Sequence, residues 1–373
     1  MQVTLANWRS SPFNRWAFHH VRELIPSADI ANDPRHIREL PSEQRSMDVR
    51  IDPDSGEALD LEAFLRETET DGMAIVHRGR LVFEHYANGM THETPHILMS
   101  VSKSMLGLLV EALGLDTARE VTEIIPELRP TAYRGATLRH LLDMRTGIAW
   151  DENYLATSGP IIEYRKSTGW NPLGPGDTPS DLHSFYANLK EQDGPHGGRF
   201  HYTSPNSDLL GWVIERAAGA RYADLMSELV WKPAGAERSA YITVDRLGAP
   251  RCAGGMCVTL RDLARVGVWV LEQGMTERFE RDGDPKAWAA GDMAPYYPRL
   301  PMRYRSQWYV LDANRGETAV PLAFGMGIHG QNLFVDRVND LVIAKLSSQA
   351  MPMDAARIGL TMRAVSEVRK LLA

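Results

Sequence analysis

The order of strand-like and helical patterns along the chain is the feature that most constrains its fold. Two β-rich runs flank the turn Arg78-Gly79 within residues 73–86, which predicts a β-hairpin. Two further strand-like runs, 332–338 and 341–348, surround the turn Asn339-Asp340 near the end of the chain. Strands therefore stand at both ends of the sequence, and the region between them reads as an insertion.

Helical patterning fills the middle of the chain and its C-terminus. Asn206 or Ser207 is expected to cap one of these helices and Thr259 another, because their side chains can accept a hydrogen bond from the first turn. Helices placed between two groups of strands are typical of an α+β protein. Apolar residues recur at i, i+3 and i+4 in the segments 104–114, 136–144, 206–219, 260–274 and 355–372.

Three stretches show no regular pattern. Residues 26–60 are polar and contain Pro, so they read as an extended N-terminal arm. Residues 165–199 are crowded with Gly and Pro and read mostly as loop. Residues 285–320 carry many Pro, Trp and Tyr residues but little periodicity, so they predict no regular element.

A chain of 373 residues is long enough for one very large domain or two interleaved ones. We predict that residues 1–99 and 240–373 form an antiparallel sheet flanked by helices, and that residues 100–239 form an inserted, mainly helical domain. Such an arrangement places a cleft between the two parts, which is a common location for active sites.

The composition limits the classes of function. The chain carries 41 Lys and Arg against 48 Asp and Glu, a formal net charge of −7, whereas a nucleic-acid binder needs a basic face. The start of the chain does not read as a signal peptide, and no apolar run is long enough to span a bilayer. We therefore expect a cytoplasmic protein without nucleic-acid or membrane partners. The histidines, Cys252 and Cys257 match no metal-ligand spacing, and no nucleotide-binding motif is present, so no metal and no cofactor are expected.

Ser100 is the candidate nucleophile. It opens the run Ser-Val-Ser-Lys, and an apolar helical segment follows at once. If a helix begins near Ser100, the three-residue spacing brings Ser100 and Lys103 to one face, with their Cβ atoms about 5–6 Å apart. A hydroxyl becomes a good nucleophile when a base removes its proton, and a lysine acts as that base when burial lowers its pKa from about 10.4. The alternative is an ordinary capping serine followed by a solvated lysine, because S-x-x-K occurs by chance about once in a chain of this length.

Further segments, in the same order along the chain, resemble one family. The similar segments are LMSVSKS at 98–104, TLRHLLDMRTGI at 137–148, FHYTSPNSDLLGWVIER at 200–216, AGGMCVTLRDLARVG at 253–267, GIHGQNLFVD at 327–336 and LVIAKLSS at 341–348. Together they resemble the serine β-lactamase and penicillin-binding superfamily, in its class C β-lactamase and family VIII carboxylesterase branch, and within it the 6-aminohexanoate-dimer hydrolases. The resemblance covers nearly the whole chain. It implies a β-lactamase-like fold and favours the catalytic interpretation of Ser100.

By this resemblance Tyr202 takes the place of the family's second motif, a tyrosine that passes a proton between the nucleophile and the leaving group. We expect positive charge on Lys103 to lower the pKa of this phenol or to share its proton. The asparagine of the usual Tyr-x-Asn pattern is displaced: Ser204 stands two residues after Tyr202, and Asn206 follows. Outside the family context, the alternative is a buried tyrosine with a satisfied hydroxyl.

The family's third motif aligns with Gly325-Met326-Gly327, which lacks the cation that β-lactamases use to grip a carboxylate. The resemblance retains the strand itself, so the backbone N–H groups of Ser100 and Ile328 are expected to form the oxyanion hole. A glycine-rich bend in a strand is the alternative. His329 invites a Ser-His-Asp interpretation, but the chain has no G-x-S-x-G elbow, and a structural histidine beneath the site is favoured.

The resemblance also implies which residues face the substrate: Tyr154, Trp170, Gly327 and His329. Tyr154 lies where the family presents a tyrosine to the substrate, and Trp170 is placed to wall the pocket, with plain loop packing as the alternative for both. Arg165 stands where 6-aminohexanoate-dimer hydrolases show a carboxylate. Because like charges repel, we expect poor hydrolysis of substrates that carry an ammonium group there.

The sequence thus predicts a serine hydrolase that cleaves small esters or linear amides through an acyl-enzyme intermediate. The first alternative is a β-lactamase or D-peptidase, against which the missing cation at Gly325 and the missing export signal speak. The second is a catalytically silent, penicillin-binding-like sensor, against which the intact Ser100, Lys103 and Tyr202 speak. The expected partner is a small-molecule substrate, and a homodimer is left open.

Overall fold

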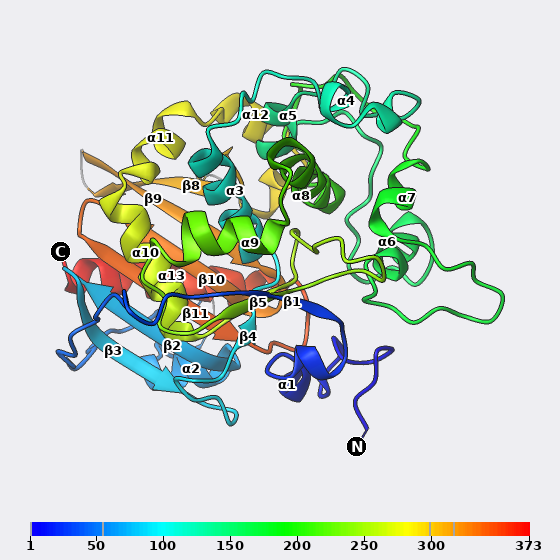
Figure 1. Cartoon of the computed structure of the whole chain (residues 1–373). Coiled ribbons are helices and arrows are strands. Elements are labelled where there is room, and N and C mark those ends of the chain that lie inside the picture. The colour runs from blue at the N-terminus through cyan, green and yellow to red at the C-terminus, as the bar shows by residue number, and fades with distance from the viewer. Residues whose placement is uncertain (1, 54–55, 298–299, 316–317) are drawn as a thin grey trace.

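A large antiparallel sheet lies on one side of the molecule, to the left of the helices α4 to α8 in Figure 1. The computed structural model describes residues 2–53, 56–297, 300–315 and 318–373. Among them, seven strands run in the order β3-β2-β11-β10-β9-β8-β7, and every neighbouring pair is antiparallel. The strands are β2 (Thr70–His77), β3 (Arg80–Tyr86), β7 (Met302–Arg305), β8 (Trp308–Arg315), β9 (Thr318–Gly327), β10 (Gln331–Asp336) and β11 (Leu341–Ser347). Strands from the two ends of the chain therefore meet, because β2 pairs with β11.

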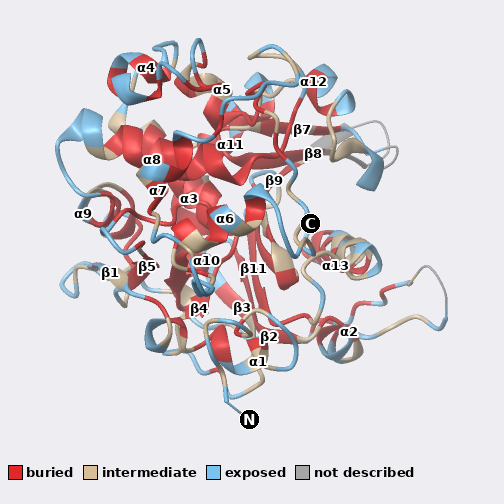
Figure 2. Cartoon of the chain, turned by 90° about the vertical axis from the view of Figure 1, so that its right-hand side faces the viewer, coloured by how far each residue is buried: buried red, intermediate tan, exposed pale blue. Residues whose placement is uncertain are grey.

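Helices cover both faces of this sheet. On one face α10 (Leu260–Glu272) lies against β2, β10 and β11. On the other face α2 (Leu61–Glu67) packs against α13 (Ala355–Leu371). Figure 2 shows the buried residues concentrated in the strands and in the inner helices. This is the α+β arrangement that the sequence predicted.

Alternation along the strands explains how both faces become apolar. In β11, Val342 and Ala344 join the apolar cluster that includes α10, whereas Leu341 and Ile343 join the cluster that includes α2 and α13. A strand buried on both faces reads as a continuous apolar run, and each fully buried Val, Leu or Ile side chain contributes about 1.5–3 kcal/mol. Gly267 allows α10 to approach this strand closely, because a Cβ atom on it would lie 2.4 Å from Val342 Cγ1.

A smaller sheet carries the segment that leads to Ser100. Within the described residues its four strands run in the order β1-β5-β6-β4, again with antiparallel neighbours. They are β1 (Ser27–Ile30), β4 (His96–Ile97), β5 (Ala240–Thr243) and β6 (Met256–Val258). The expected extended arm at 26–60 thus contains a strand. Its four residues carry too little pattern to reveal it, because pairing with the distant β5 is what makes them a strand.

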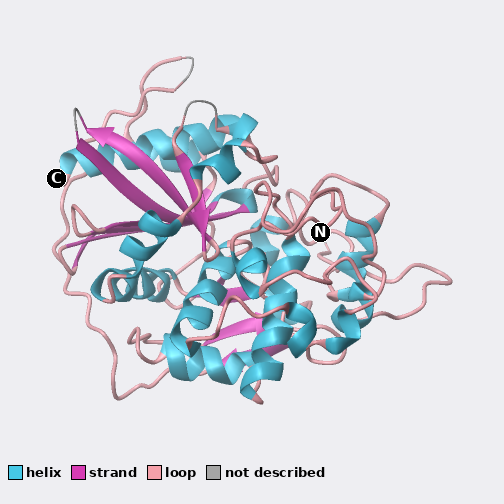
Figure 3. Ribbon diagram, turned by 90° about the horizontal axis from the view of Figure 1, so that it is seen from above, coloured by secondary structure: helices cyan, strands magenta, loops and turns pink. Residues whose placement is uncertain are grey.

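The middle of the chain is mainly helical, as predicted (Figure 3). Its helices are α3 (Val101–Leu113), α4 (Val121–Ile124), α5 (Leu138–Leu142), α6 (Pro160–Ser167), α7 (Leu182–Tyr186), α8 (Ser204–Ala218) and α9 (Tyr222–Met226). The long helix α3 packs against α8 and against β8, β9 and β10. One apolar cluster joins α3, α8 and the large sheet, so the domain boundaries at residues 99–100 and 239–240 stay a prediction.

Local patterns were informative for one hairpin and for one of the two predicted helix caps. The hairpin at residues 73–86 is confirmed as β2 and β3, and Thr259 caps α10 by accepting a hydrogen bond from the backbone N–H of Asp262. The cap of α8 was predicted wrongly: it is Thr203, because the helix begins at Ser204 with Pro205 in its first turn, a position that proline favours.

The prediction of no regular element at 285–320 was wrong as well. That stretch contains α12 (Pro285–Ala289), β7, β8 and the start of β9, while residues 298–299 and 316–317 within it lie outside the described residues. The strand β7 has only four residues, which is too short for its alternation to be recognised. The remaining helices are α1 (Asn14–Ala17) and α11 (Met275–Asp282). In the described part of the chain, no helix combines the length and the apolarity needed to cross a bilayer.

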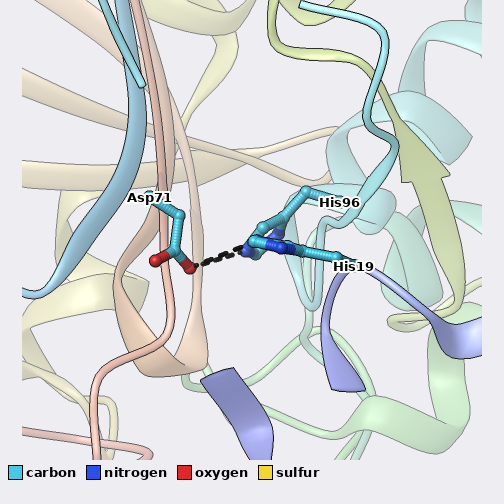
Figure 4. A group of neighbouring side chains, drawn as sticks. All are labelled: His19, Asp71 and His96. Carbon is cyan, nitrogen blue, oxygen red and sulfur yellow. Dashed lines mark hydrogen bonds and ion pairs between the residues drawn. The ribbon is translucent and has the colours of Figure 1, made fainter. Parts of the chain in front are cut away.

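A buried carboxylate ties the N-terminal segment to both sheets (Figure 4). Asp71 of β2 is fully buried; its Oδ2 lies 3.2 Å from His96 Nε2 of β4 and 3.6 Å from His19 Nε2. Its other oxygen accepts a hydrogen bond from the Ser348 hydroxyl at 3.1 Å. Burial alone would raise the pKa of Asp71, but the contacts with His19 and His96 outweigh it and hold this pKa well below its usual range. The segment just before Ser100 is thereby fixed in place.

Replacing this carboxylate tests how much the cluster stabilises the fold. We expect Asp71→Asn to lower the free energy of unfolding by about 3–5 kcal/mol, because removing one partner leaves a buried polar network unbalanced. Urea unfolding followed by circular dichroism measures the change. The control is Asp29→Asn, which removes an exposed ion pair with Arg22 and should cost no more than about 1 kcal/mol. Equal effects of the two substitutions would contradict the role given to Asp71.

Candidate active site

Ser100 stands at the junction between β4 and α3. It is the N-terminal cap residue of α3, but its side chain makes no capping hydrogen bond, so the hydroxyl is not used to stabilise the helix. The preceding residue, Met99, is buried and has φ of 45°, in the left-handed region that costs a side chain about 1–3 kcal/mol. Strain of this kind is typical of functional sites, and here it sets the direction in which Ser100 leaves the strand.

Lys103 follows one turn later, and its side chain is almost completely removed from water. The residue is 1% exposed, and its Nζ lies 3.0 Å from Ser100 Oγ, 3.1 Å from Ser204 Oγ and 2.7 Å from the carbonyl oxygen of Ala253. Burial lowers the pKa of Lys103 to about 7, although Glu152 acts in the opposite direction. A substantial fraction of this amine is therefore neutral near pH 7.

The partners of Lys103 are themselves held by buried charges. Asp208 of α8 pairs with Arg251, and its other oxygen accepts a hydrogen bond from the Ala253 N–H at 2.7 Å. This contact fixes the Ala253 peptide, whose carbonyl meets the amine of Lys103. The buried ion pair thus positions one acceptor of the lysine.

Glu152 positions Ser204, another hydrogen-bond partner of Lys103. The Ser204 hydroxyl donates a hydrogen bond to Glu152 Oε1 at 2.5 Å, and the Ser204 N–H donates to Oε2 at 3.0 Å. Trp150 Nε1 also donates to Oε2, at 2.6 Å. No pattern in the sequence indicated this contact, because Glu152 belongs to no motif and lies on a segment distant from Ser204. The displaced Asn206, in contrast, is buried away from the cleft and bonds to Thr146 at 2.9 Å.

Tyr202 lies beside the same two groups. Its ring centroid is 5.0 Å from Lys103 Nζ, and its hydroxyl forms a hydrogen bond with the Ser100 side chain. Burial raises the pKa of Tyr202 above its usual value. This corrects the expectation that positive charge on Lys103 lowers it: desolvation dominates, and the lysine itself is driven toward its neutral form. At neutral pH the phenol keeps its proton and can donate it.

The end of β9 lies directly against Ser100. A Cβ atom on Gly327 would be 2.9 Å from the Ser100 nitrogen and 2.7 Å from the Leu98 oxygen, so only glycine allows this approach. Ile328 follows and lines the same cleft as Ser100. Within the described residues we find no hydrogen-bond partner for the N–H of Ser100 or of Ile328. Two free donors beside the hydroxyl are what an oxyanion hole requires.

The cleft in front of Ser100 has a volume of about 530 Å³. Tyr154, Tyr202 and Gly327 line it, and Tyr154 also lines a second, small pocket of about 30 Å³ that Trp170 walls. His329 does not line either space. Its buried ring donates a hydrogen bond from Nδ1 to the Gln349 carbonyl at 2.7 Å, and burial lowers its pKa to about 4.

One group of the described residues has the spacing of a metal site. The ligand-type atoms of His19, Asp71 and His96 lie within 4.8 Å of one another. None of these residues lines the cleft, and the other ring nitrogen of His96 faces the Ile97 carbonyl at 2.8 Å. The cluster therefore serves the fold rather than the chemistry at Ser100, and the expectation that the chain needs no metal stays a prediction.

Comparison with known proteins places this geometry in a family. The β-lactamase family model matches residues 60–365. The chain belongs to the β-lactamase family. It is 35% identical to the 6-aminohexanoate-dimer hydrolase of Paenarthrobacter ureafaciens over 366 residues, which cover 94% of this chain and 89% of that enzyme. This confirms the family resemblance that the sequence motifs indicated.

Solved structures agree with this placement. A Bacillus anthracis protein assigned as a 6-aminohexanoate-dimer hydrolase superposes with a TM-score of 0.87 at 25% identity, over 99% of this chain and 97% of the other. EstCE1, a hydrolase with promiscuous acyltransferase activity, gives a TM-score of 0.61 at 18% identity over 82% and 96% of the two chains, and shows the fold alone. Members of the β-lactamase family are serine hydrolases, and this protein is one.

The titration of Lys103 predicts how activity depends on pH. Because only the neutral amine can accept a proton, we expect kcat/KM for an ester to rise about tenfold per pH unit below pH 7 and to level off above it. Initial rates between pH 5 and 9, corrected for spontaneous hydrolysis, measure this profile.

A substitution beside Lys103 tests whether the midpoint of this pH profile belongs to that lysine. Glu152→Gln removes a negative charge that raises the lysine pKa, so the midpoint should move to lower pH. The exposed Glu163→Gln should leave it unchanged. A profile without an inflection between pH 6 and 8 would contradict the account.

Proposed function

We propose that this serine hydrolase cleaves small esters and linear amides through an acyl-enzyme formed on Ser100. The observation that carries the proposal is the 3.0 Å contact between Ser100 Oγ and the buried amine of Lys103, whose pKa lies at about 7. A buried amine beside a hydroxyl does not stabilise the fold, because removing the charged form of the amine from water costs free energy. It has a clear value for removing the proton of the hydroxyl.

The hydrogen bonds around Lys103 support a neutral amine as the base. A neutral amine offers two N–H donors and one lone pair. The Ala253 carbonyl can only accept, and Ser204 already donates its own proton to Glu152, so both take an N–H from Lys103. The lone pair is then left facing Ser100 Oγ. In the first step the Ser100 proton moves to Nζ of Lys103 while Oγ bonds to the substrate carbonyl carbon.

The tetrahedral intermediate carries its negative charge on the former carbonyl oxygen. We assign the N–H groups of Ser100 and Ile328 as its donors, each worth about 2.7–4 kcal/mol when pre-organised. Tyr202 keeps its proton and hydrogen-bonds to Ser100, so it is placed to protonate the leaving group, and Lys103 then restores the proton of the phenol. The bond to the leaving group breaks as the carbonyl re-forms. Water, activated by the same groups, then hydrolyses the acyl-enzyme.

The size and lining of the cleft support small linear substrates. Its volume of about 530 Å³ is in the range of small-molecule sites, and tyrosines line it together with Met326. The relative from Paenarthrobacter ureafaciens is named for an amide-linked dimer, which extends the proposal from esters to linear amides.

The β-lactamase alternative has less support. The strand position that carries a cation in the third motif is Gly325, and a Cβ atom there would lie 2.7 Å from Ser104 Oγ. No side chain longer than hydrogen fits without rearrangement, so this strand offers nothing to grip a β-lactam carboxylate. The sensor alternative explains neither the lowered pKa of Lys103 nor the free donors of Ser100 and Ile328.

Covalent labelling tests the nucleophile. We expect the protein to gain the mass of one fluorophosphonate group, and Ser100→Ala to gain none, because only the hydroxyl beside Lys103 is activated. Intact mass spectrometry measures both. Ser102→Ala, two residues further on, removes a hydroxyl that merely accepts from the Met256 N–H and should leave the labelling intact. An equal adduct on the Ser100→Ala protein would remove Ser100 from the mechanism.

The proton-transfer roles predict large losses of turnover. Lys103→Ala and Tyr202→Phe should each lower kcat for p-nitrophenyl acetate at least about 100-fold, the usual scale of proton-transfer catalysis. Tyr296→Phe is the matched control, since this exposed tyrosine also lines the cleft. Nitrocefin assayed in parallel should turn over far more slowly than the ester. Near-native turnover of either variant, or preferred cleavage of nitrocefin, would overturn the corresponding part of the proposal.

A further inference from the structure

A small pocket beside Ser100 is lined by two arginines that have no acidic partner. The pocket holds about 30 Å³, and its wall includes Ser100, Tyr154, Trp170, Arg9 and Arg165. It shares Ser100, Glu152, Tyr154 and Ile328 with the lining of the main cleft, so the two spaces meet at the reacting hydroxyl. Its contents must therefore come from a molecule bound at Ser100 or from solvent.

Arg165 is buried without a counter-ion. It is 7% exposed, and its guanidinium donates a hydrogen bond to the Tyr154 carbonyl at 3.0 Å. Across the described residues, no carboxylate oxygen lies within 4.0 Å of Arg165 or of Arg9, which donates to the Asn171 side-chain oxygen at 2.5 Å. Arg251, a third arginine of this wall, is instead paired with Asp208. Neither arginine is therefore in an ion pair with a described residue. The Glu152 carboxylate, which also lines the pocket, attracts Arg165 from beyond 4 Å, and Arg9 lies over the rings of Trp8 and Trp170.

Besides burial, nearby positive charge lowers the pKa of both arginines. Burial, with Arg165 and Arg251 nearby, lowers the pKa of Arg9 to about 9, and burial lowers the pKa of Arg165. The neighbouring carboxylate, Glu152, is occupied by Ser204 and Trp150. An external anion would remove the repulsion and satisfy both guanidinium groups, which are suited to bind a carboxylate through two parallel hydrogen bonds.

The size of the pocket fits such a group. One water molecule needs about 10–15 Å³ of cavity volume. The pocket of about 30 Å³ therefore accommodates two or three atoms of that size. The two oxygens of a terminal carboxylate match this space, whereas a ring or a branched chain does not. The methylenes that join the carboxylate to the reacting carbonyl would lie outside the pocket, where it meets the main cleft beside Ser100 and Tyr154.

The position of Tyr202 indicates which part of the substrate enters. Tyr202 lines the main cleft but not the small pocket. Since the leaving group must lie near the phenol that protonates it, the leaving group occupies the main cleft. The acyl part then extends from Ser100 toward the small pocket, which Arg165 lines.

We propose that Arg165 and Arg9 bind a carboxylate on the acyl part of the substrate, so that the preferred substrates are monoesters and monoamides of short dicarboxylic acids. This rests on the proposed function of Ser100 and Tyr202 and specifies its substrate class. It also predicts poor binding of acyl groups that end in an ammonium, which two arginines would repel.

Matched esters test the preference. 4-Methylumbelliferyl esters of adipic, hexanoic and 6-aminohexanoic acid share the same six-carbon acyl chain and differ in terminal charge, and the succinic and glutaric monoesters vary its length. We expect kcat/KM for the best dicarboxylic monoester to exceed that for the hexanoyl ester at least tenfold, with the 6-aminohexanoyl ester lowest. A ratio of one or less, while the hexanoyl ester is cleaved in a Ser100-dependent manner, would overturn the carboxylate site and leave the proposed function standing.

Variants assign the preference to the arginines. Arg165→Gln and Arg9→Gln should each lower the adipoyl-to-hexanoyl ratio of kcat/KM at least tenfold, and Arg165→Glu should favour the 6-aminohexanoyl ester. The matched control is Lys166→Gln, the adjacent cation, which pairs with Glu163 and Asp177 at the surface and should leave the ratio unchanged. An unchanged ratio in both arginine variants would refute their role. Arg9→Gln keeps the test valid if the buried Arg165 variants fail to fold.

Binding gives a readout that does not depend on turnover. N-butyl adipic acid monoamide should bind Ser100→Ala at least tenfold more tightly than N-butyl hexanamide by calorimetry, and added salt should weaken only the first. If no ester is cleaved and Ser100 takes no fluorophosphonate, the proposed function fails, and this measurement alone decides the carboxylate site. Equal affinities would overturn it.

Discussion

The chemistry of this protein depends on keeping one lysine amine out of water beside a serine hydroxyl. Lys103 is 1% exposed, and the cost of burying its charge is what brings its pKa to about 7. The surrounding polar groups do not cancel that cost, because Ala253 offers a neutral carbonyl and Ser204 a hydroxyl already committed to Glu152. The charged groups nearby, Asp208 and Arg251, mainly compensate each other. The amine is therefore held as a base rather than as one half of a salt bridge.

The fold supplies this arrangement by joining distant segments. Ser100 and Lys103 begin a helix that packs against the large sheet and the helical part at once, while Tyr202 precedes α8 and Ile328 follows β9. Strands from the C-terminal part of the chain pair with strands from its N-terminal part in one sheet. The end of β9 therefore lies beside the start of α3, where Gly327 permits close contact. The buried Asp71 cluster holds β4 just upstream, so the left-handed Met99 is constrained from both sides.

Much of this could be predicted from the sequence, and the parts that could not share a cause. The long helices and the hairpin of β2 and β3 were visible because their apolar period repeats several times, and Ser100, Lys103 and Tyr202 were marked by motifs whose order resembles a family. The strand β8 was missed although it has eight residues, because it lies in a stretch without clear periodicity. The strands β1 and β7 have four residues each and depend on their partners, so no local pattern reveals them. Glu152 and Arg9 join the site through contacts that cross long stretches of chain. One of the two effects expected of Lys103 on Tyr202, a lowered pKa of the phenol, was predicted wrongly, because the burial of Tyr202 cannot be read from its neighbours in the sequence. The sharing of a proton between the two groups stays a prediction.

The central claim is that Lys103 is a neutral amine near physiological pH, and its own titration tests this most directly. The chain contains seven lysines, which can be labelled with ¹³C at Cε and followed by NMR as the pH is raised. The signal absent from Lys103→Arg should titrate near pH 7, and the other buried lysine, Lys345, can be assigned through its own variant. Lys166 serves as the reference, because its surface contacts with Asp177 and Glu163 raise its pKa above the usual value for a lysine. If the Lys103 signal instead follows this reference, the amine is a permanent cation and cannot be the base that activates Ser100.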